Sequence, residues 1–443
     1  MRRVMADRTT AALRGASLPL RQLLTLSIYW LGIQTIWGGL NLIVIPSRLD
    51  ALNRESSGTM MGILLILGAL AAIIVQPTVG VISDYTISRW GRRKPYIVIG
   101  TAFDMLFLAG LALGNQFLAI LAFYFLLQVS SNFAQGPFQG YVPDLVPARQ
   151  VGLASGLMGL MLALGTIVGV GLATVGGGII GEPLTVMTLG VVELGTMVLL
   201  VTTVREGSDA PPRTRSWPQV ALSAWGRDIL QQRDVLWLLL VRLLFLGAYN
   251  ATVFGYAYFT RTQGLGDQEA KDTVFLATAI VGALTLLAAL PGGRLSDRFG
   301  RRPVIWAASG LCTLALVGVT LAPSRELAIP AWVPFGIGIG TFLSADWALM
   351  ADVIPKDATG RYMGILNAGT AMAGPVYAAI GGPILDFVAG SYGDPLGPRA
   401  AMLTAAAFVA LSGLALTRVN PRRREAGEPA APAEAAAPAP SPA

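Results

Sequence analysis

Long apolar stretches alternate with short polar ones along most of this chain of 443 residues. A helix that crosses a membrane needs about 20 mostly apolar residues. Twelve stretches meet that requirement, near residues 22–46, 58–82, 95–114, 117–142, 150–175, 184–204, 234–260, 271–293, 303–321, 329–353, 361–388 and 398–418. The pattern therefore predicts an all-α membrane protein with twelve transmembrane helices.

One longer polar segment separates the twelve stretches into two groups of six. It predicts a cytoplasmic linker with a surface helix around residues 217–229. The end of the chain is rich in Ala, Pro and Glu and cannot bury enough apolar surface to fold. The predicted parts are an N-terminus (1–21), a first six-helix bundle (22–204), the linker (205–233), a second six-helix bundle (234–418) and a disordered tail (419–443).

Composition supports the membrane assignment, since 54% of the residues are hydrophobic and 13% are charged. Soluble domains average about 25% charged residues. The chain has no histidine, and its single cysteine, Cys312, lies in an apolar run. We find no nucleophile–base pair, phosphate loop or metal-ligand cluster in the sequence. These features argue against an enzyme, and we expect no metal and no cofactor.

The positions of Lys and Arg predict the orientation in the membrane. Twenty-five of the 32 cations lie in the segments that are inside if the N-terminus is inside, and six lie in the outer loops. Cytoplasmic loops are enriched in Lys and Arg. Both termini are therefore predicted to be cytoplasmic, in a multi-pass protein of the plasma membrane. Because topology accounts for the net charge of +7, nucleic-acid binding is not expected.

The two groups of six stretches repeat each other. The motif Gly-Arg-Arg begins at Gly91 and again at Gly300, 209 positions later. Asp144 and Asp352 each open an Asp-x-x-Pro motif and are 208 positions apart. These matched spacings predict a duplicated unit and two pseudo-symmetric bundles in parallel orientation, because six spans return the chain to the same side.

The loop after the second predicted span carries Gly-x-x-x-Asp, ending at Asp84, and then Gly-Arg-Arg-Lys at 91–94. Together with twelve spans in two halves, it resembles the major facilitator superfamily over roughly residues 20–420. The resemblance implies a transporter whose spans 1, 4, 7 and 10 line a central cavity. It also implies a cytoplasmic latch in which Asp84 faces the start of span 11 near residues 359–360. The predicted latch residues are Asp84, Arg92, Arg93, Asp144, Asp297, Arg301, Arg302 and Asp352.

A narrower resemblance lies in the fourth span, at residues 128–144. Its pattern is similar to that of the plant sucrose–proton symporters and the related glycoside–pentoside–hexuronide transporters. The matching residues are Asn132, Gln135, Gly136, Pro137 and Asp144. Two positions differ, because the family has an acid where this chain has Gln128 and an arginine where it has Gln139. In the family that acid is the proton site, so the resemblance implies a sugar substrate but leaves the proton site to other residues.

Polar and aromatic side chains recur at helical spacing in spans 1 and 4, and each set shares one helical face. Aromatic faces and uncharged amides together suit a sugar. The alternative is that the amides join neighbouring helices. The predicted substrate-binding residues are Trp30, Gln34, Trp37, Asn41, Tyr124, Gln128, Ser131, Asn132, Gln135, Arg242, Asn250 and Asp346.

Four charged residues lie inside predicted spans: Asp104, Glu193, Arg242 and Asp346. Such charges are costly in a membrane and are candidates for proton coupling. We expect Asp346 to take the proton, with Arg242 as its charge partner. A structural ion pair is the alternative for these two, and a structural role is favoured for Asp104 and Glu193.

The sequence thus predicts a secondary active transporter, a sugar:proton symporter for a di- or oligosaccharide or glycoside. The main alternative is a drug or metabolite exporter that works as a proton antiporter on the same fold. A relative without transport activity is a third. The expected partners are a small sugar, a proton and the lipid bilayer, and the expected state is a monomer.

Overall fold

The computed structural model describes residues 17–206, 233–353 and 359–419. Within them, every regular element is a helix. The side chains of residues 148, 351–352, 359–365 and 367–368 are outside the description. The predicted surface helix at 217–229 and most of both predicted terminal segments also lie outside it.

The first half begins with a long helix in three parts and continues with five further membrane-length helices. The three parts are α2 (Leu20–Gly39), the π-helical turn η1 (Leu40–Val44) and α3 (Ile45–Leu52). The others are α4 (Ser57–Asp84), α5 (Lys94–Leu113), α6 (Phe117–Gln139), α8 (Val151–Ile179) and α9 (Glu182–Thr203). Two short elements, α7 (Tyr141–Leu145) and η2 (Ala148–Gln150), join α6 to α8.

The second half has the same order. Its first helix is α11 (Arg233–Tyr249), η4 (Asn250–Phe254), α12 (Gly255–Ala257) and η5 (Tyr258–Thr262). The others are α13 (Asp267–Phe299), α14 (Arg301–Leu321), α15 (Arg325–Val353), α16 (Thr359–Tyr392) and α17 (Leu396–Ala415), followed by the short η7 (Leu416–Arg418). Twelve helices in the described residues are long and apolar enough to cross a membrane, which confirms the predicted number.

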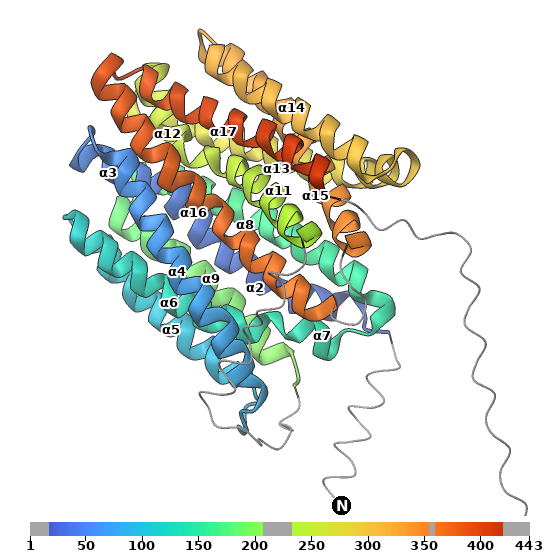
Figure 1. The fold of residues 1–443 in the computed structure, drawn as a ribbon. Coiled ribbons are helices and arrows are strands. Elements are labelled where there is room, and N and C mark those ends of the chain that lie inside the picture. The colour runs from blue at the N-terminus through green and yellow to red at the C-terminus, as the bar shows by residue number, and fades with distance from the viewer. Residues whose placement is uncertain (1–16, 207–232, 354–358, 420–443) are drawn as a thin grey trace, which may run out of the picture.

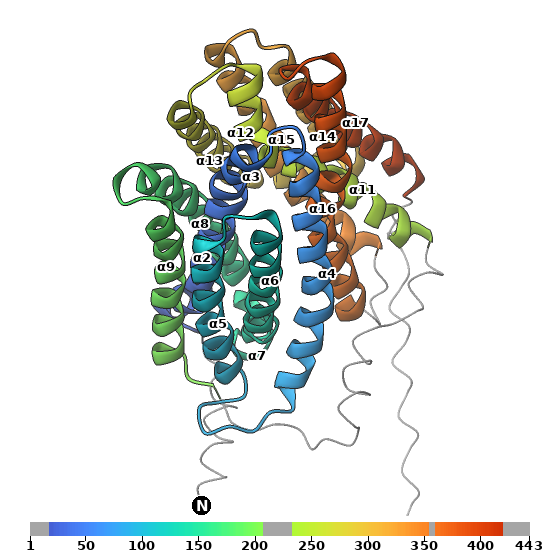
Figure 2. The ribbon, with the colours of Figure 1, turned by 90° about the vertical axis from the view of Figure 1, so that its left-hand side faces the viewer.

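Each half is a bundle of six, and the two bundles lie side by side (Figures 1 and 2). In the first bundle α2 packs on α8 and α9, and α5 on α6 and α9. Between the bundles, α4 packs on α16 and α8 on α13. We call the end of the molecule with the 85–93 loop the inner side and the end with α3 and α12 the outer side.

The first helix of each half departs from regular α-helix at the same place. The π-helical turn η1 contains Asn41, and the 3₁₀ turn η4 begins at Asn250, 209 positions later. Helix irregularities of this kind often mark functional hinges. The two turns contact each other across the boundary between the halves, so the repeat extends to local backbone geometry.

The predicted end of span 1 at residue 46 is wrong, because the helix continues to Leu52. Arg48, predicted in an outer loop, lies within α3. Its guanidinium donates to the carbonyl oxygen of Ala112 at 2.9 Å and pairs with Glu182. The charge is therefore satisfied by the end of α5 and the start of α9, and the helix extends beyond its apolar stretch.

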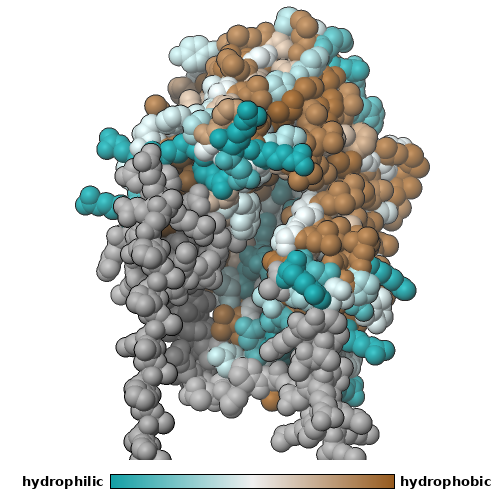
Figure 3. Space-filling model, turned by 90° about the vertical axis from the view of Figure 1, so that its right-hand side faces the viewer, coloured by the Kyte–Doolittle hydropathy of each residue, from teal (hydrophilic) through white to brown (hydrophobic). Residues whose placement is uncertain are grey.

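The surface agrees with a membrane setting. Large apolar side chains are exposed on most helices, including Leu113 and Leu290 at 75% and Ile179 at 74%. In Figure 3 hydrophobic residues cover much of the coloured surface at the top and right, and hydrophilic residues lie in a hollow near the centre of this face. Lipid is the solvent that suits the exposed apolar surface.

Candidate functional site

On the inner side, Arg93 lies between two carboxylates. Its guanidinium is 2.9 Å from Asp84 at the end of α4 and 2.7 Å from Asp144 in α7. Arg92 also pairs with Asp144. The predicted reach of both arginines to Asp144 is confirmed, and in this structure Asp84 is held by Arg93. All four residues belong to the first half.

Two glycines make this arrangement possible. Gly91 has a φ of +110°, a backbone conformation that other residues rarely adopt. A Cβ at Gly140 would stand 1.1 Å from Nη1 of Arg93, so Arg93 occupies the space of a side chain at 140. There it donates to the carbonyl oxygen of Pro137 at 2.7 Å, next to the end of α6. The guanidinium thus ties α4, α6 and α7 together.

Glu206 completes the inner cluster and is not among the predicted residues. Its carboxylate accepts the backbone N–H groups of Lys94 at 2.9 Å and of Arg93 at 3.2 Å, at the start of α5. An acid at a helix N-terminus satisfies free N–H groups and complements the helix dipole. Burial raises the pKa of Glu206 above its usual range.

The second Gly-Arg-Arg loop differs from the first. Gly300 has a φ of +92°, which matches Gly91, but α13 continues through Asp297 to Phe299. Arg301, the first residue of α14, pairs with Asp297 four positions earlier. The side chains of Asp352 and of residues 359–360 lie outside the described residues. Their predicted contacts, with Arg302 and with Asp84, stay predictions.

A chain of hydrogen bonds links the polar faces of the first and fourth spans. Tyr124 donates to Oδ1 of Asn41 at 3.1 Å, and Gln128 donates to the Tyr124 hydroxyl at 3.3 Å. Asn132 donates to Oε1 of Gln128 at 3.1 Å. Trp37 packs edge-on against Tyr124, with ring centroids 5.7 Å apart. We call these five residues the amide chain; in it Tyr124 and Asn132 are buried, while Asn41, Gln128 and Trp37 are half-buried.

The other predicted substrate residues of the first half make contacts outside the amide chain. Gln135 donates to Ser131 at 3.0 Å within α6, and both are buried. Trp30 packs against Phe138 at 5.5 Å between centroids. Gln34 lies against Gly165 of α8, where a Cβ would stand 2.9 Å from the Cβ of Gln34.

In the second half, Asn250 lies against Gly374 of α16, where a Cβ would stand 2.5 Å from its Cγ. It donates to the carbonyl oxygen of Leu246 at 2.9 Å. Asn41, its repeat equivalent, instead accepts a hydrogen bond from Tyr124. The two asparagines are therefore equivalent in position but not in their contacts.

The predicted pairing of Arg242 with Asp346 is confirmed. Nη1 of Arg242 contacts Oδ2 of Asp346, and the two side chains are 3% and 0% exposed. Thr370 of α16 accepts from Nη2 of Arg242 at 2.7 Å. Oδ1 of Asp346 is buried without a hydrogen-bond partner. This ion pair joins α11, α15 and α16 and leaves one carboxylate oxygen unsatisfied.

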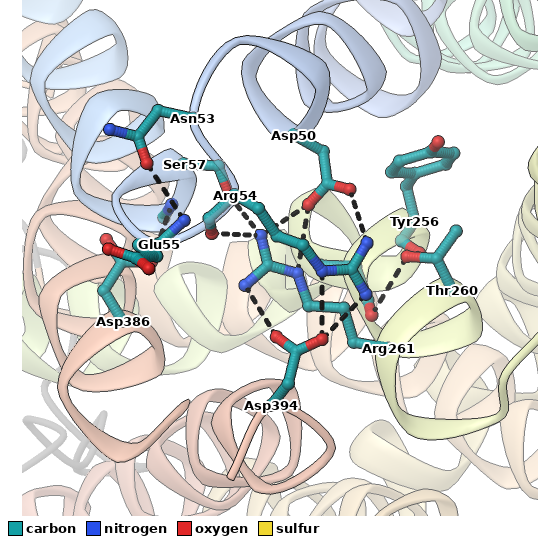
Figure 4. Close-up of polar contacts among 12 residues, drawn as sticks. Asp50, Asn53, Arg54, Glu55, Ser57, Tyr256, Thr260, Arg261, Asp386 and Asp394 are labelled. Carbon is teal, nitrogen blue, oxygen red and sulfur yellow. Dashed lines mark hydrogen bonds and ion pairs between the residues drawn. The ribbon is translucent and has the colours of Figure 1, made fainter. Parts of the chain in front are cut away.

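A cluster on the outer side joins the two halves (Figure 4). Arg261 of η5 is fully buried, and its Nε donates to Oδ1 of Asp50 in α3 at 3.0 Å. Arg54 donates from Nη1 to Asp50 at 3.1 Å and from Nη2 to Asp394 at 2.7 Å. Arg261 also donates to Oγ of Ser57 at 2.6 Å. We call Asp50, Arg54, Arg261 and Asp394 the outer latch, because two of its ion pairs, Arg261–Asp50 and Arg54–Asp394, connect residues of opposite halves.

A second contact across the halves lies beside the outer latch. Asp386 of α16 accepts the backbone N–H of Gly58 at 3.0 Å and of Thr59 at 2.6 Å, at the start of α4. A Cβ at Gly382 would stand 2.1 Å from the carbonyl oxygen of Gly58, so the two helix backbones touch. The carboxylate of one half thus caps a helix of the other, a favourable place for negative charge.

The inner end of α8 makes no such close contact with the other half. A Cβ at Gly152, Gly156 or Gly159 would meet no atom within 4 Å. The outer contacts between the halves are closed, while this inner face of small residues is uncovered. The described residues therefore form an arrangement that is closed between the halves on the outer side and uncovered along α8 on the inner side.

Comparison with known proteins agrees with this architecture. The model of the Major Facilitator Superfamily matches residues 23–378 and 271–441. A bacterial homolog of the human lysosomal transporter Spinster, solved in an inward-facing and occupied conformation, superposes with a TM-score of 0.68 at 15% identity, covering 91% of this chain and 97% of that one. The nucleoside transporter NupG gives a TM-score of 0.70 at 13% identity, with 90% and 99% covered. At these identities the likeness concerns the fold alone.

Sequence relatives match over a shorter region. Sucrose transport protein SUT1 of Oryza sativa subsp. japonica is 32% identical over 124 residues, which is 23% of each chain. Sucrose transport protein SUC4 of Arabidopsis thaliana is 34% identical over 124 residues, 23% of this chain and 24% of the relative. The matched region thus spans about a quarter of the length of these curated relatives.

Proposed function

This chain belongs to the major facilitator superfamily, and we propose that it is a sugar:proton symporter that imports a di- or oligosaccharide or glycoside by alternating access. The amide chain carries this proposal. It offers amide groups and a tryptophan face on the two helices that, in this superfamily, line the central cavity. Sugars bind to such combinations of hydrogen-bonding groups and flat apolar surface. The regional similarity to sucrose transport proteins supports the same substrate class.

The outer latch and the uncovered inner face of α8 support the proposed mechanism. With the outer latch closed and the inner α8 face uncovered, substrate leaves toward the inner side. Opening the outer side requires the latch and the Asp386 cap to separate, while the inner ends of the halves approach each other. We propose that the inner side is cytoplasmic, in agreement with the charge bias, and that one chain in the plasma membrane is the working unit.

The direct test is uptake of labelled disaccharide by proteoliposomes that contain the full chain. An inward proton gradient is expected to drive accumulation, whereas a sodium gradient without a pH difference is not. The control is the same vesicles with the proton gradient dissipated by an ionophore. Absence of sugar flux under both gradients would refute the sugar proposal, and proton-driven export of an apolar drug would establish the alternative exporter.

Gly156→Trp tests the rocking movement. Because a Cβ at 156 meets no atom in this structure, the indole is accommodated in the inward-open state. It prevents the inner ends of the halves from closing, and we expect sugar counterflow to fall at least tenfold while thermal stability is unchanged. Gly195→Trp is the matched control, since Gly195 is also uncovered but lies on α9, away from the second half. Undiminished counterflow in the Gly156 variant would contradict this movement.

A further inference from the structure

Two buried acidic side chains, 89 positions apart in sequence, lie next to each other in the first half. Asp104 of α5 and Glu193 of α9 are both 0% exposed, and their carboxyl groups lie within hydrogen-bonding reach of each other. Oδ2 of Asp104 and Oε2 of Glu193 are buried and have no hydrogen-bond partner. Each carboxyl group thus has one buried oxygen that makes no hydrogen bond, at the place where the helices of the first half meet.

The surrounding groups come from every helix of the junction. The Tyr29 hydroxyl of α2 donates to Oε1 of Glu193 at 3.2 Å and lies 2.6 Å from the Thr101 hydroxyl of α5. Ser130 of α6 donates to Oδ1 of Asp104. These neighbours are hydroxyl groups. In the described part of the chain, no lysine or arginine forms an ion pair with either acid.

This set of neighbours does not balance two negative charges. Two carboxylates in contact repel each other, and burial without a cation adds the loss of hydration to both. Two carboxyl groups that share a site hold a proton between them for this reason. One proton converts the two unsatisfied oxygens into a donor and an acceptor, so it resolves the charge and the hydrogen bonding together.

We propose that Asp104 and Glu193 form a proton-binding site that holds one shared proton throughout the transport cycle. All four contributing helices belong to the same half, which moves as a unit in a rocking mechanism. Hydroxyl groups donate hydrogen bonds to the other two carboxyl oxygens. The side chains of both acids and of their three hydroxyl neighbours are buried. The proton therefore stays in place while the gates alternate. The claim that this proton is retained, with proton coupling left to Asp346, rests on the proposed function. The claim that the site binds a proton does not rest on it.

The test is infrared spectroscopy of the full chain in lipid at neutral pH. A protonated carboxylic acid has a C=O stretching band distinct from that of ionised carboxylates. We expect the wild-type protein to show one such band that is lost in Glu193→Gln and in Asp104→Asn. Either amide donates an N–H to the remaining carboxylate, reproducing the charge and hydrogen bond of the singly protonated pair. The band is expected to persist in Glu269→Gln, a control acid that is half-exposed and paired with Arg325.

The two amide variants give independent measurements, so failure of one to fold leaves the other. Absence of the band from the wild-type protein, or its persistence in both amide variants, overturns the proton site. Transport supplies a second readout, in which Glu193→Gln is expected to retain proton-driven accumulation. If this variant exchanges sugar but no longer accumulates it, the shared proton is the transported one, and its retention through the cycle is refuted. The infrared result needs no substrate and is unaffected if the sugar proposal fails.

Discussion

Asp346→Asn is expected to abolish accumulation of sugar against its gradient while sugar exchange across the membrane continues. Asp346 is fully buried and is held by Arg242, whose own side chain is 3% exposed. In the proposed mechanism, protonation of the carboxylate removes the attraction that holds the guanidinium and frees it for a substrate hydroxyl. Asparagine fits the same space but takes up no proton, so the site no longer couples proton entry to sugar binding.

The measurement compares two assays on the same proteoliposomes. Uptake driven by a proton gradient is expected to fall to the level of equilibration, and counterflow of labelled against unlabelled sugar is expected to continue. Thermal stability is measured alongside, because removing one member of a buried ion pair costs about 3–5 kcal/mol. Glu269→Gln, an exposed ion-pair residue, is the control and should change neither assay. Accumulation at the wild-type level in Asp346→Asn would rule out Asp346 as the coupling acid.

Arg261→Gln is expected to shift the protein from the inward-open toward the outward-open state. Arg261 has a fully buried side chain between Asp50 and Asp394, so after its loss these acids keep the half-exposed Arg54 as their ion-pair partner in the described part of the chain. The Arg261–Asp50 pair joins the halves in this state, so the cost of removing it falls on this state. Because Arg54 remains paired with both acids and Asp394 is 42% exposed, we expect less than the full cost of breaking a buried ion pair, about 1.4 kcal/mol, which changes the equilibrium roughly tenfold.

A thiol probe on the inner side reports this shift. After Cys312 is replaced, Gly156→Cys places a thiol on the uncovered face of α8, and its labelling rate by a polar maleimide is expected to fall in Arg261→Gln. Arg325→Gln is the matched control, because the Arg325–Glu269 pair is also on the outer side but lies within one half and is exposed. An unchanged labelling rate in a variant of normal thermal stability would mean that the latch does not set the conformational balance.

The sequence was sufficient for the parts of the molecule that depend on local pattern. Apolar stretches of membrane length give the twelve helices, and the repeated Gly-Arg-Arg spacing gives the two halves. Arg93 with Asp144 and Arg242 with Asp346 were also predictable, because each charge lies in a motif or inside a span, where a partner is required.

Contacts between distant outer residues were not predictable in the same way. Asp50 and Arg261 are 211 positions apart in stretches whose charges resemble those of an ordinary hydrated loop. No periodicity marks them, and their burial arises only when the two halves close against each other. The same reason applies to Glu193 and Asp104, whose isolated positions suggested a structural role but whose contact depends on how α5 and α9 pack.

Because Arg93 fills the space beside Gly140, the residue that evolution allows at position 140 depends on the residue at position 93. The guanidinium stands where a side chain at 140 would begin, so any residue larger than glycine there excludes arginine in this conformation. A lineage that acquires alanine at 140 must therefore also lose or redirect the arginine at 93. Once the arginine is gone, Asp144 keeps Arg92 but Asp84 loses the ion-pair partner that it has in this structure, and selection on the acids relaxes in turn. Substitutions at these four positions are expected to arise together in related chains, although 47 positions separate residues 93 and 140.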